Sequence, residues 1–307
     1  MQRSFLGIEI GGTKLQLVAG DAHARVTTRR RFTVDKAHGG GGIRAQIAGA
    51  LPELMVLVKP AALGVGFGGP VDSATGQICC SHQIEGWSEF PLGEWLRGLT
   101  GLPVTVDNDA NTAALGEALR GAGVGSNPVF YVTLGSGVGG GLVVDGRIYH
   151  GAKPGEAEIG HVRLDKSGVT IEQRCAGWAV DRKIREACQR EPRSPLAQLT
   201  ADADHGEARA LAPALAQGDA LARRILDEVA DDLAFGLSHV TQLMNPEVIV
   251  LGGGLSLVGE PLRAAVASAL KRYVMEAFAP GPRVVLAGLG EDAVPTGALL
   301  LAQGASQ

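Results

Sequence analysis

The sequence is poor in several features that mark particular classes of protein. Only four of its 307 residues are cysteine and none forms a Cys-x-x-Cys pair, which argues against a disulfide framework or a cysteine-based metal knuckle. Lysine and arginine number 28 against 32 acidic residues, so no basic field favours nucleic acid. There is no run of about 18 apolar residues to span a membrane, and Glu9 and Lys14 interrupt the first apolar stretch, unlike a signal peptide. We therefore expect a soluble cytoplasmic protein with no nucleic-acid or membrane partner.

Glycine, in contrast, is abundant. The chain has 45 glycines in 307 residues, about 15%, which is roughly double the usual share. They follow no Gly-X-Y period, so collagen is excluded, and they gather in short clusters after apolar stretches. Such clusters are typical of backbone that approaches a ligand closely. The length allows one large domain or two ordinary ones.

One strand–turn–strand pattern occurs twice. Residues 5–10 and 15–19 are predicted strands around a Gly-Gly-Thr-Lys turn, and residues 129–134 and 142–144 flank a glycine-rich turn at 135–141. Backbone N–H groups in glycine turns can face an anion, and a threonine hydroxyl and a lysine add to the attraction. The copies start 124 residues apart (129 minus 5), which indicates a duplicated domain. The alternative is a pair of unrelated hairpins.

The polar loop within residues 104–114 is the strongest candidate for chemistry. Residues 104–106 are expected to end a strand and 112–120 to form a helix, because alanine and leucine favour helix and nothing breaks the run. Between them lie Asp107, Asn108, Asp109 and Asn111. One or two of these would cap the helix, but a cap does not need four. Loops after strands are where α/β sheets build sites, so we interpret Asp109 as a base for a substrate hydroxyl.

The rest of the chain alternates predicted strands and helices. Strands are expected at 26–34, 63–67, 248–251 and 283–287, and helices at 43–58, 92–99, 179–188, 221–243, 261–278 and 293–303, with a flexible glycine turn at 39–42. The strand at 248–251 ends in Gly252-Gly253-Gly254, which can lie against a flat or anionic ligand. This order predicts an α/β fold.

Five stretches, in this order and spacing, resemble the ROK family (repressor, open reading frame, kinase) of the superfamily that includes sugar kinases and actin. Ile8-Glu-Ile-Gly-Gly-Thr-Lys resembles its first phosphate motif and Gly135-Ser-Gly-Val-Gly-Gly-Gly the second. Asp107-Asn-Asp-Ala-Asn is similar to the catalytic loop, Glu158-Ile-Gly-His to the family signature and Leu251-Gly-Gly-Gly-Leu to the adenosine-side turn. The resemblance covers about residues 5–302.

The resemblance implies an ATP- and Mg²⁺-dependent, glucokinase-like enzyme with two actin-like (ribonuclease H-like) domains, a mixed five-stranded sheet in each and a cleft between them. Asp109 would be the general base, and Glu9 would reach Mg²⁺ through water. The implied sugar-binding residues are Asn108, Glu158, Glu172, His161 and Gly69. The implied nucleotide-binding residues are Gly11, Gly12, Thr13, Lys14, Thr133, Gly135, Ser136, Gly137, Gly253 and Gly254.

Several positions depart from the family pattern. Glu9 stands where the family usually has an Asp near Mg²⁺, and Gln83 stands where it usually has an Asn that affects sugar specificity. Gly68 replaces a usual Pro, and Ala157 replaces a usual Gly. Many members carry a cysteine-rich zinc loop after the signature histidine, but residues 162–174 contain no cysteine. His161 alone cannot build a tetrahedral site, so we expect no structural zinc.

The expected first domain is 1–115, completed by a C-terminal helix at about 291–307, and the second is 116–290. The family often forms dimers, so a homodimer is expected. A kinase for fructose, allose or N-acetylhexosamines is one alternative to glucose, and a non-catalytic sugar sensor is another. A sugar-responsive repressor would need a helix-turn-helix before the kinase-like region, which is not expected here because the first strand starts at about residue 5.

Overall fold

The computed structural model describes residues 3–81, 84–153 and 157–306. Contacts divide the chain into two compact units, each of which is described by itself. The first unit comprises Met1–Gly125, Gly141–Ala157 and Gly288–Gln307, and the second comprises Ser126–Gly140 and Glu158–Ala287. The domain boundaries expected from the sequence stay a prediction; the contact-based units differ from them in placing residues 116–125 and 141–157 in the first unit.

The first unit is built on a mixed five-stranded sheet with the order β3-β2-β1-β4-β7. Its strands are β1 (Phe5–Ile10), β2 (Lys14–Gly20), β3 (Val26–Thr33), β4 (Leu63–Phe67) and β7 (Val104–Asn108), beside a small hairpin of β5 (Val71–Asp72) and β6 (Gln77–Ile78). Strands β1, β4 and β7 run parallel, and β2 and β3 are antiparallel to their neighbours. The C-terminal ends of β1, β4 and β7 therefore meet at one edge, where α/β sheets place their sites.

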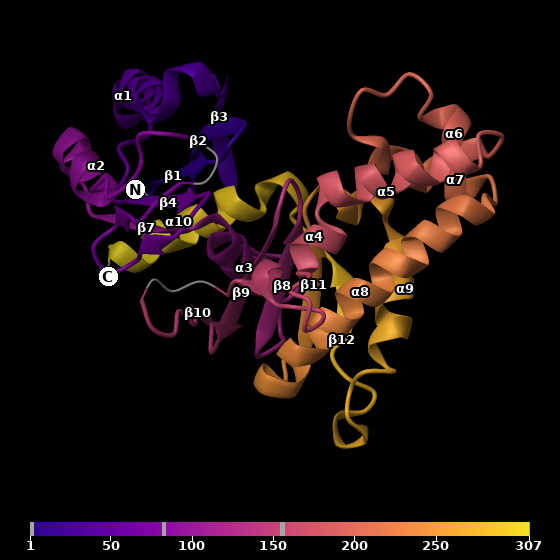
Figure 1. Ribbon diagram of the computed structural model, residues 1–307. Helices are drawn as coiled ribbons and strands as arrows, with labels where there is room; N and C mark the ends of the chain where they lie inside the picture. Colours follow the sequence, from indigo (N-terminus) through magenta and orange to yellow (C-terminus); the bar gives the residue numbers. More distant parts are fainter. Residues whose placement is uncertain (1–2, 82–83, 154–156, 307) are drawn as a thin grey trace. The chain divides into compact units, whose positions relative to one another are not determined.

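Helices cover both faces of this sheet (Figure 1). They are η1 (Lys36–His38), α1 (Gly39–Val58), α2 (Leu92–Thr100), α3 (Asp109–Arg120), η6 (Gly290–Asp292) and α10 (Ala293–Ala305). Leucines and isoleucines of α1 and α2 fill one core with the inward residues of β1, β2, β4 and β7. Leu115 of α3 and Leu299 of α10 belong to a second core with Phe5 and Val18. Burial of these side chains against the sheet is the main force that holds the unit together.

Small residues let α3 and α10 approach closely. A Cβ atom at Gly297 of α10 would lie 1.8 Å from the Thr112 carbonyl oxygen, and one at Gly116 of α3 would lie 2.4 Å from the Ala293 carbonyl oxygen. Neither position can accept a side chain without moving a helix. This packing fixes the helix that begins at Asp109.

The second five-stranded sheet has the order β10-β9-β8-β11-β12 and repeats the design of the first. Its strands are β8 (Val129–Leu134), β9 (Val138–Val144), β10 (Arg147–Ile148), β11 (Val248–Gly252) and β12 (Arg283–Leu286). Strand β11 is parallel to β8 and β12, and β10 is antiparallel to β9. The two mixed sheets, each of which starts with a glycine-turn hairpin, confirm the expected α/β, actin-like fold.

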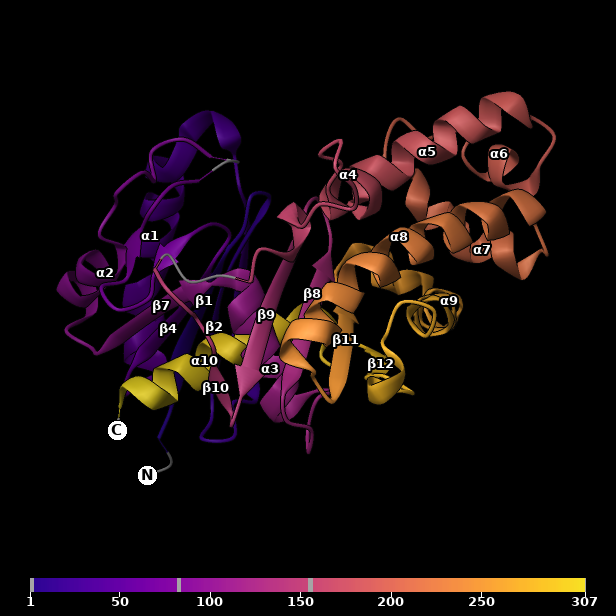
Figure 2. The ribbon, with the colours of Figure 1, turned by 60° about the horizontal axis from the view of Figure 1, so that its bottom comes forward.

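The helices of the second unit gather around the long helix α8 (Ala220–Met244). Figure 2 shows α5 (Gly177–Arg190) and α7 (Leu211–Ala216) beside it, with α6 (Pro195–Leu199) packed on α5 and α7. The remaining elements are η2 (Ile159–His161), α4 (Ile171–Cys175), η3 (Glu207–Ala210), η4 (Gly254–Val258), α9 (Glu260–Leu270) and η5 (Glu276–Phe278). The apolar stripe of α8 is buried, as its sequence pattern predicts.

Four predicted boundaries are wrong. Helix α1 begins at Gly39, where a flexible turn was expected, because Gly40 is buried against Trp87 and its N–H donates to the Glu85 carbonyl. Helix α3 begins at Asp109 rather than 112, because the residue before it caps the helix. Strand β9 begins at Val138, so residues 138–141 are strand rather than turn. Helix α9 ends at Leu270, eight residues early.

The chain that follows α9 is held against α8. Tyr273 and Arg272 both bind the Asp231 carboxylate, and the Tyr273 carbonyl accepts from Gln242. The N–H groups of Arg272 and Tyr273 still donate to the carbonyls of Ala269 and Leu270, so α9 gives way to turns that these contacts hold in place.

Residues 36–58 are long and apolar enough to cross a membrane by length and composition alone, contrary to the expectation that no such stretch exists. The structure gives this segment another role. Ile43, Ile47, Leu51 and Leu54 of α1 lie in the main core of the first unit. The segment is thus a core helix with an exposed outer face.

Candidate active site

The N-terminus of α3 is capped by the side chain of Asn108. Its Oδ1 accepts hydrogen bonds from the N–H groups of Ala110 (2.8 Å) and Asn111 (3.1 Å), and its Nδ2 donates to the Gly69 carbonyl (3.2 Å). Asn108 thus satisfies helix donors that would otherwise be unpaired. It also joins the loop after β4 to the end of β7, which brings together two of the predicted sugar-binding residues.

Asp107 is buried and holds the same loop from the other side. Its Oδ1 accepts from the Asn108 N–H (2.8 Å) and from Asn111 Nδ2 (3.1 Å), and its Oδ2 lies 2.6 Å from His150 Nε2. The Asp107 side chain is 3% exposed and that of His150 is 33% exposed. An ionised carboxylate is an acceptor only, so the imidazole donates. His150 was not predicted, because a single histidine after a two-residue strand carries no sequence signal.

Asp109 begins α3 and is half-buried between buried neighbours. It lies close to Gly68, since a Cβ atom at that glycine would be 3.3 Å from Asp109 Oδ2 and 3.6 Å from the Cα atom of Gly11. The Gly68 N–H donates to the Ile10 carbonyl at 2.8 Å. The first glycine turn and the polar loop therefore meet at the C-terminal edge of the sheet.

The first glycine turn has free backbone donors. Gly11 closes the turn by donating to the Lys14 carbonyl (2.9 Å). In the described part of the chain the N–H groups of Gly12 and Thr13 donate to no protein acceptor. These two donors, with the glycine backbone around them, form an anion-binding concavity of the kind that phosphate groups occupy.

Glu9 and Lys14 lie beside this turn and contact each other. Lys14 Nζ is 3.1 Å from Glu9 Oε1, and Gln16 Nε2 donates to Glu9 Oε2. The Glu9 side chain is only 12% exposed. The carboxylate is thus held in place by two donors, and the longer side chain at this position is accommodated without an unpaired charge.

The second glycine turn is anchored by Glu172. Gly135 donates to the Gly137 carbonyl (2.9 Å), and Glu172 Oε2 accepts from the Val138 N–H (2.9 Å). A Cβ atom at Gly137 would lie 2.7 Å from the same carboxylate oxygen. Glu172, predicted as a sugar-binding residue, therefore lies directly against a predicted phosphate turn.

A pocket of about 680 Å³ opens beside this turn. It brings together three of the predicted nucleotide-binding residues, Gly135, Ser136 and Gly254. Gly253 supports it from behind: its φ is +78°, and a Cβ atom there would lie 2.5 Å from the Leu134 nitrogen. Only glycine fits this position. Thr133 lies on β8 and pairs in register with Gly252, so it supports the turn and does not line the pocket.

The other walls of the pocket were not predicted. Trp178 and Leu257 line it and are 42% and 82% exposed, a high exposure for large apolar side chains. Asp181 accepts hydrogen bonds from the N–H groups of Gly206 and Ala208, which fixes the loop on the opposite side. An open slot with apolar walls beside a glycine turn suits a ligand with a flat ring.

Glu158 and His161 lie at the ends of η2 in the second unit. Both side chains are largely exposed, 49% and 72%, and His161 Nε2 is 3.9 Å from Glu158 Oε2. Gly160 between them packs on β9, since a Cβ atom there would lie 2.2 Å from the Val138 carbonyl oxygen. Gln83, the position expected to affect sugar specificity, lies outside the described residues.

Within residues 3–81, 84–153 and 157–306, no three His, Cys, Asp or Glu side chains form a group that could hold a metal ion. Mg²⁺ does not need such a group, because it is usually held by water and substrate phosphates with one or two carboxylates. Glu9 is the carboxylate beside the first glycine turn that could serve in this way. The expected lack of a structural zinc stays a prediction.

Comparison with known proteins agrees with the motifs. The model of the ROK family matches residues 5–305. A glucokinase of Halalkalibacterium halodurans is 33% identical over 308 residues, covering 95% of this chain and 92% of the relative. A glucokinase of Thermotoga maritima is 31% identical, covering 95% of each. The crystal structure of a ROK family glucokinase from Streptomyces griseus in complex with glucose and AMPPNP has a TM-score of 0.86 at 29% identity and covers 99% of this chain and all of that one. The protein therefore belongs to the ROK family.

Proposed function

We propose that this protein phosphorylates glucose at its 6-hydroxyl, with Asp109 as the general base. That the chain is an ATP-dependent sugar kinase follows from its family and its glucokinase relatives. The choice of sugar and the residue roles are the proposed part. Its glucokinase relatives support the choice of glucose. The observation that supports the role of Asp109 is its position, a half-buried carboxylate at the sheet edge beside Gly68 and the first glycine turn.

Each residue set has a task in phosphoryl transfer, which depends on positioning and on neutralising charge. Asp109 would accept the proton of the sugar hydroxyl as it attacks. Asn108, Gly69, Glu158, His161 and Glu172 would bind the sugar hydroxyls. The turns at Gly11–Lys14 and Gly135–Gly137 would hold phosphate oxygens, and the pocket beside Gly254 would take the adenosine. Mg²⁺, when bound near Glu9, neutralises charge on the phosphates.

The test is a coupled ADP-release assay with Mg·ATP and a panel of glucose, fructose, allose and N-acetylhexosamines. We expect turnover on glucose, and a fall in kcat of about 10²- to 10⁴-fold in Asp109→Asn, the range for loss of a general base. Asp202→Asn, an exposed position, is the matched control and should keep wild-type kcat.

Two results would reject the proposal. Preferred turnover on another sugar would replace glucose by that substrate and keep the role of Asp109. No turnover on any sugar, while a sugar still raises the melting temperature, would identify a non-catalytic sugar sensor.

We also infer that the protein acts in the cytoplasm as a homodimer, as is common in the family. Light scattering coupled to size-exclusion chromatography tests the oligomeric state, and a monomer at micromolar concentration would reject it.

A further inference from the structure

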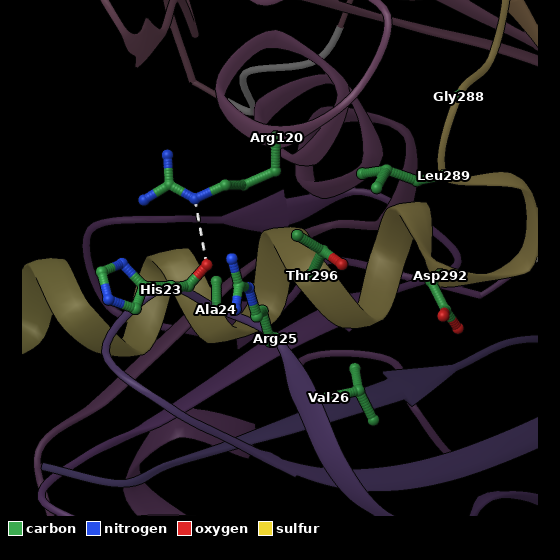
Figure 3. A pocket seen from close by; sticks show the side chains of 9 residues that line it. All are labelled: His23, Ala24, Arg25, Val26, Arg120, Gly288, Leu289, Asp292 and Thr296. Carbon is green, nitrogen blue, oxygen red and sulfur yellow. Dashed lines mark hydrogen bonds between the residues drawn. The ribbon is translucent and has the colours of Figure 1, made fainter. Parts of the chain in front are cut away.

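A second pocket in the first unit lies outside all the predicted motifs. It has a volume of about 550 Å³, which is within the range of small-molecule sites. Figure 3 shows Arg120 of α3, His23 and Arg25 of the turn between β2 and β3, and Thr296 of α10 around it. We propose that this pocket binds a small anion that carries a phosphate group.

The donors that line the pocket are available. Arg25 has no hydrogen bond or ion pair from its guanidinium in the described part of the chain. Arg120 donates from Nε to the His23 carbonyl (3.0 Å) and from Nη1 to the Leu119 carbonyl (2.8 Å). These two bonds orient the group and leave its other N–H donors unused. Guanidinium groups suit phosphate because they offer paired, charged donors.

A threonine hydroxyl adds to these donors. Thr296 lines the pocket, and among the described residues its hydroxyl makes no hydrogen bond to a protein group. The hydroxyl is therefore free to donate to a ligand in the pocket. A phosphate oxygen would accept from it.

The carboxylates nearby are already engaged. Asp292, the acidic residue of the lining, pairs with Arg29. Asp21 accepts from the N–H groups of His23 and Arg25, and these bonds hold its pKa below the usual value. The lining therefore carries two guanidinium groups and an imidazole against one neutralised carboxylate.

The walls are preorganised by Glu117, which is fully buried in α3. Its carboxylate accepts from the N–H groups of Gly288 (3.0 Å), Leu289 (2.8 Å) and Ala122 (2.8 Å). Gly288 and Leu289 line the pocket. A site that is held open before binding loses less entropy when it binds.

The test is isothermal titration calorimetry of the full chain with inorganic phosphate and, separately, with glucose 6-phosphate. Only the titration with glucose 6-phosphate rests on the proposed function. We expect saturable binding that weakens about tenfold or more in Arg25→Gln and further in Arg25→Gln/Arg120→Gln, because charge-assisted bonds are lost. Arg31→Gln is the matched control, since Arg31 pairs with Glu291 outside the lining. The kinase activity of Arg25→Gln in phosphate-free buffer should equal that of the wild type.

The two probes separate the possible ligands. Equal, Arg25-dependent binding of both means that the phosphate alone is recognised, and tighter binding of glucose 6-phosphate means that the sugar contributes. Three results would each overturn the proposal. They are no saturable heat with either probe, binding that is unchanged in Arg25→Gln, and binding that sodium chloride abolishes at the ionic strength of the phosphate solution. If the protein binds phosphate in this way but shows no kinase turnover on any sugar, the proposed function is rejected and the anion pocket is not.

Discussion

Replacing His150 with alanine should slow catalysis, because the imidazole supports the end of β7, which Asp109 follows as the first residue of α3. The Asp107 carboxylate is buried and would keep its bonds to Asn108 and Asn111 but lose the 2.6 Å bond to His150. A hydrogen bond to a charged group contributes about 1.5–3 kcal/mol. Because His150 is one-third exposed, water can enter the gap, so we expect a cost near the lower end, about 2 kcal/mol.

If that support is needed in the transition state, kcat should fall by about 30-fold, since 1.36 kcal/mol corresponds to tenfold in rate. The KM for sugar should change little, because the role proposed for His150 is to position the loop rather than to bind substrate. His150→Gln should recover part of the rate, since an amide N–H can replace the imidazole donor. The exposed residue His205 provides the control variant His205→Ala.

The assay is steady-state kinetics with a melting curve for each variant. A lowered melting temperature with wild-type kcat would show that the pair only stabilises the fold. Unchanged kinetics and melting temperature would show that the carboxylate does not depend on the imidazole at all.

Three further predictions test how the site is built. Gly253→Ala should lower the free energy of unfolding by about 3 kcal/mol, because it combines a positive φ with overlap on the Leu134 backbone. Gly254 has open space around it, so the control Gly254→Ala should change the same free energy by no more than about 0.5 kcal/mol in denaturant unfolding. Equal losses in the two variants would contradict this prediction. Glu117→Gln should cost about 2 kcal/mol because one of three N–H bonds loses its acceptor, whereas exposed Glu94→Gln should be neutral in the same melts. Burial raises the pKa of Cys175 to about 12, so its thiol should resist iodoacetamide at pH 8 when Cys79 and Cys80 react. The pKa of this thiol is higher in the folded protein than in the unfolded chain. Its contribution to stability is therefore complete below about pH 9, the pKa of an exposed thiol, and is lost as the pH rises toward 12. In Cys175→Ala the stability should fall less steeply over this alkaline range.

The sequence was sufficient for the fold class and for the elements that carry strong local signals. The Gly-Gly-Thr-Lys turn and the strand before Gly252 lie where periodicity and turn chemistry place them, whereas the polar stretch predicted as a loop forms the end of β7 and the first turn of α3. The errors fall where a distant contact decides the outcome. Gly39 starts a helix because Gly40 packs on Trp87, and α9 gives way to turns where Tyr273 and Arg272 bind Asp231. Local propensity contains no information about such partners.

The same limit applies to the site. Gly135 and Gly254, which line the pocket beside the second glycine turn, were predicted, but Trp178, Asp181 and Leu257 on its other walls were not. Their residue types are ordinary on a helix or loop, and only the fold brings them beside Gly135. For Trp178 the helix pattern does contain a signal. Its position falls outside the buried stripe of α5, so the pattern places a large apolar side chain on the exposed face of the helix.

A chain of contacts inside the first unit connects the proposed anion pocket to the phosphate turn. Asp292 lines the pocket and pairs with Arg29, Arg29 Nη1 donates to Gln16 Oε1 (3.1 Å), and Gln16 Nε2 donates to Glu9. Gln16 is fully buried, so its amide has one orientation that satisfies both neighbours. An anion bound at Arg25 would compete with Asp292 for the positive charge of Arg29. Any shift of Arg29 would move the Gln16 amide, which donates to Glu9. Because Glu9 is the carboxylate that we propose lies near Mg²⁺, we expect such a shift to alter the KM for Mg·ATP before that for sugar. Arg29→Gln should then remove the effect of phosphate on that constant without removing phosphate binding.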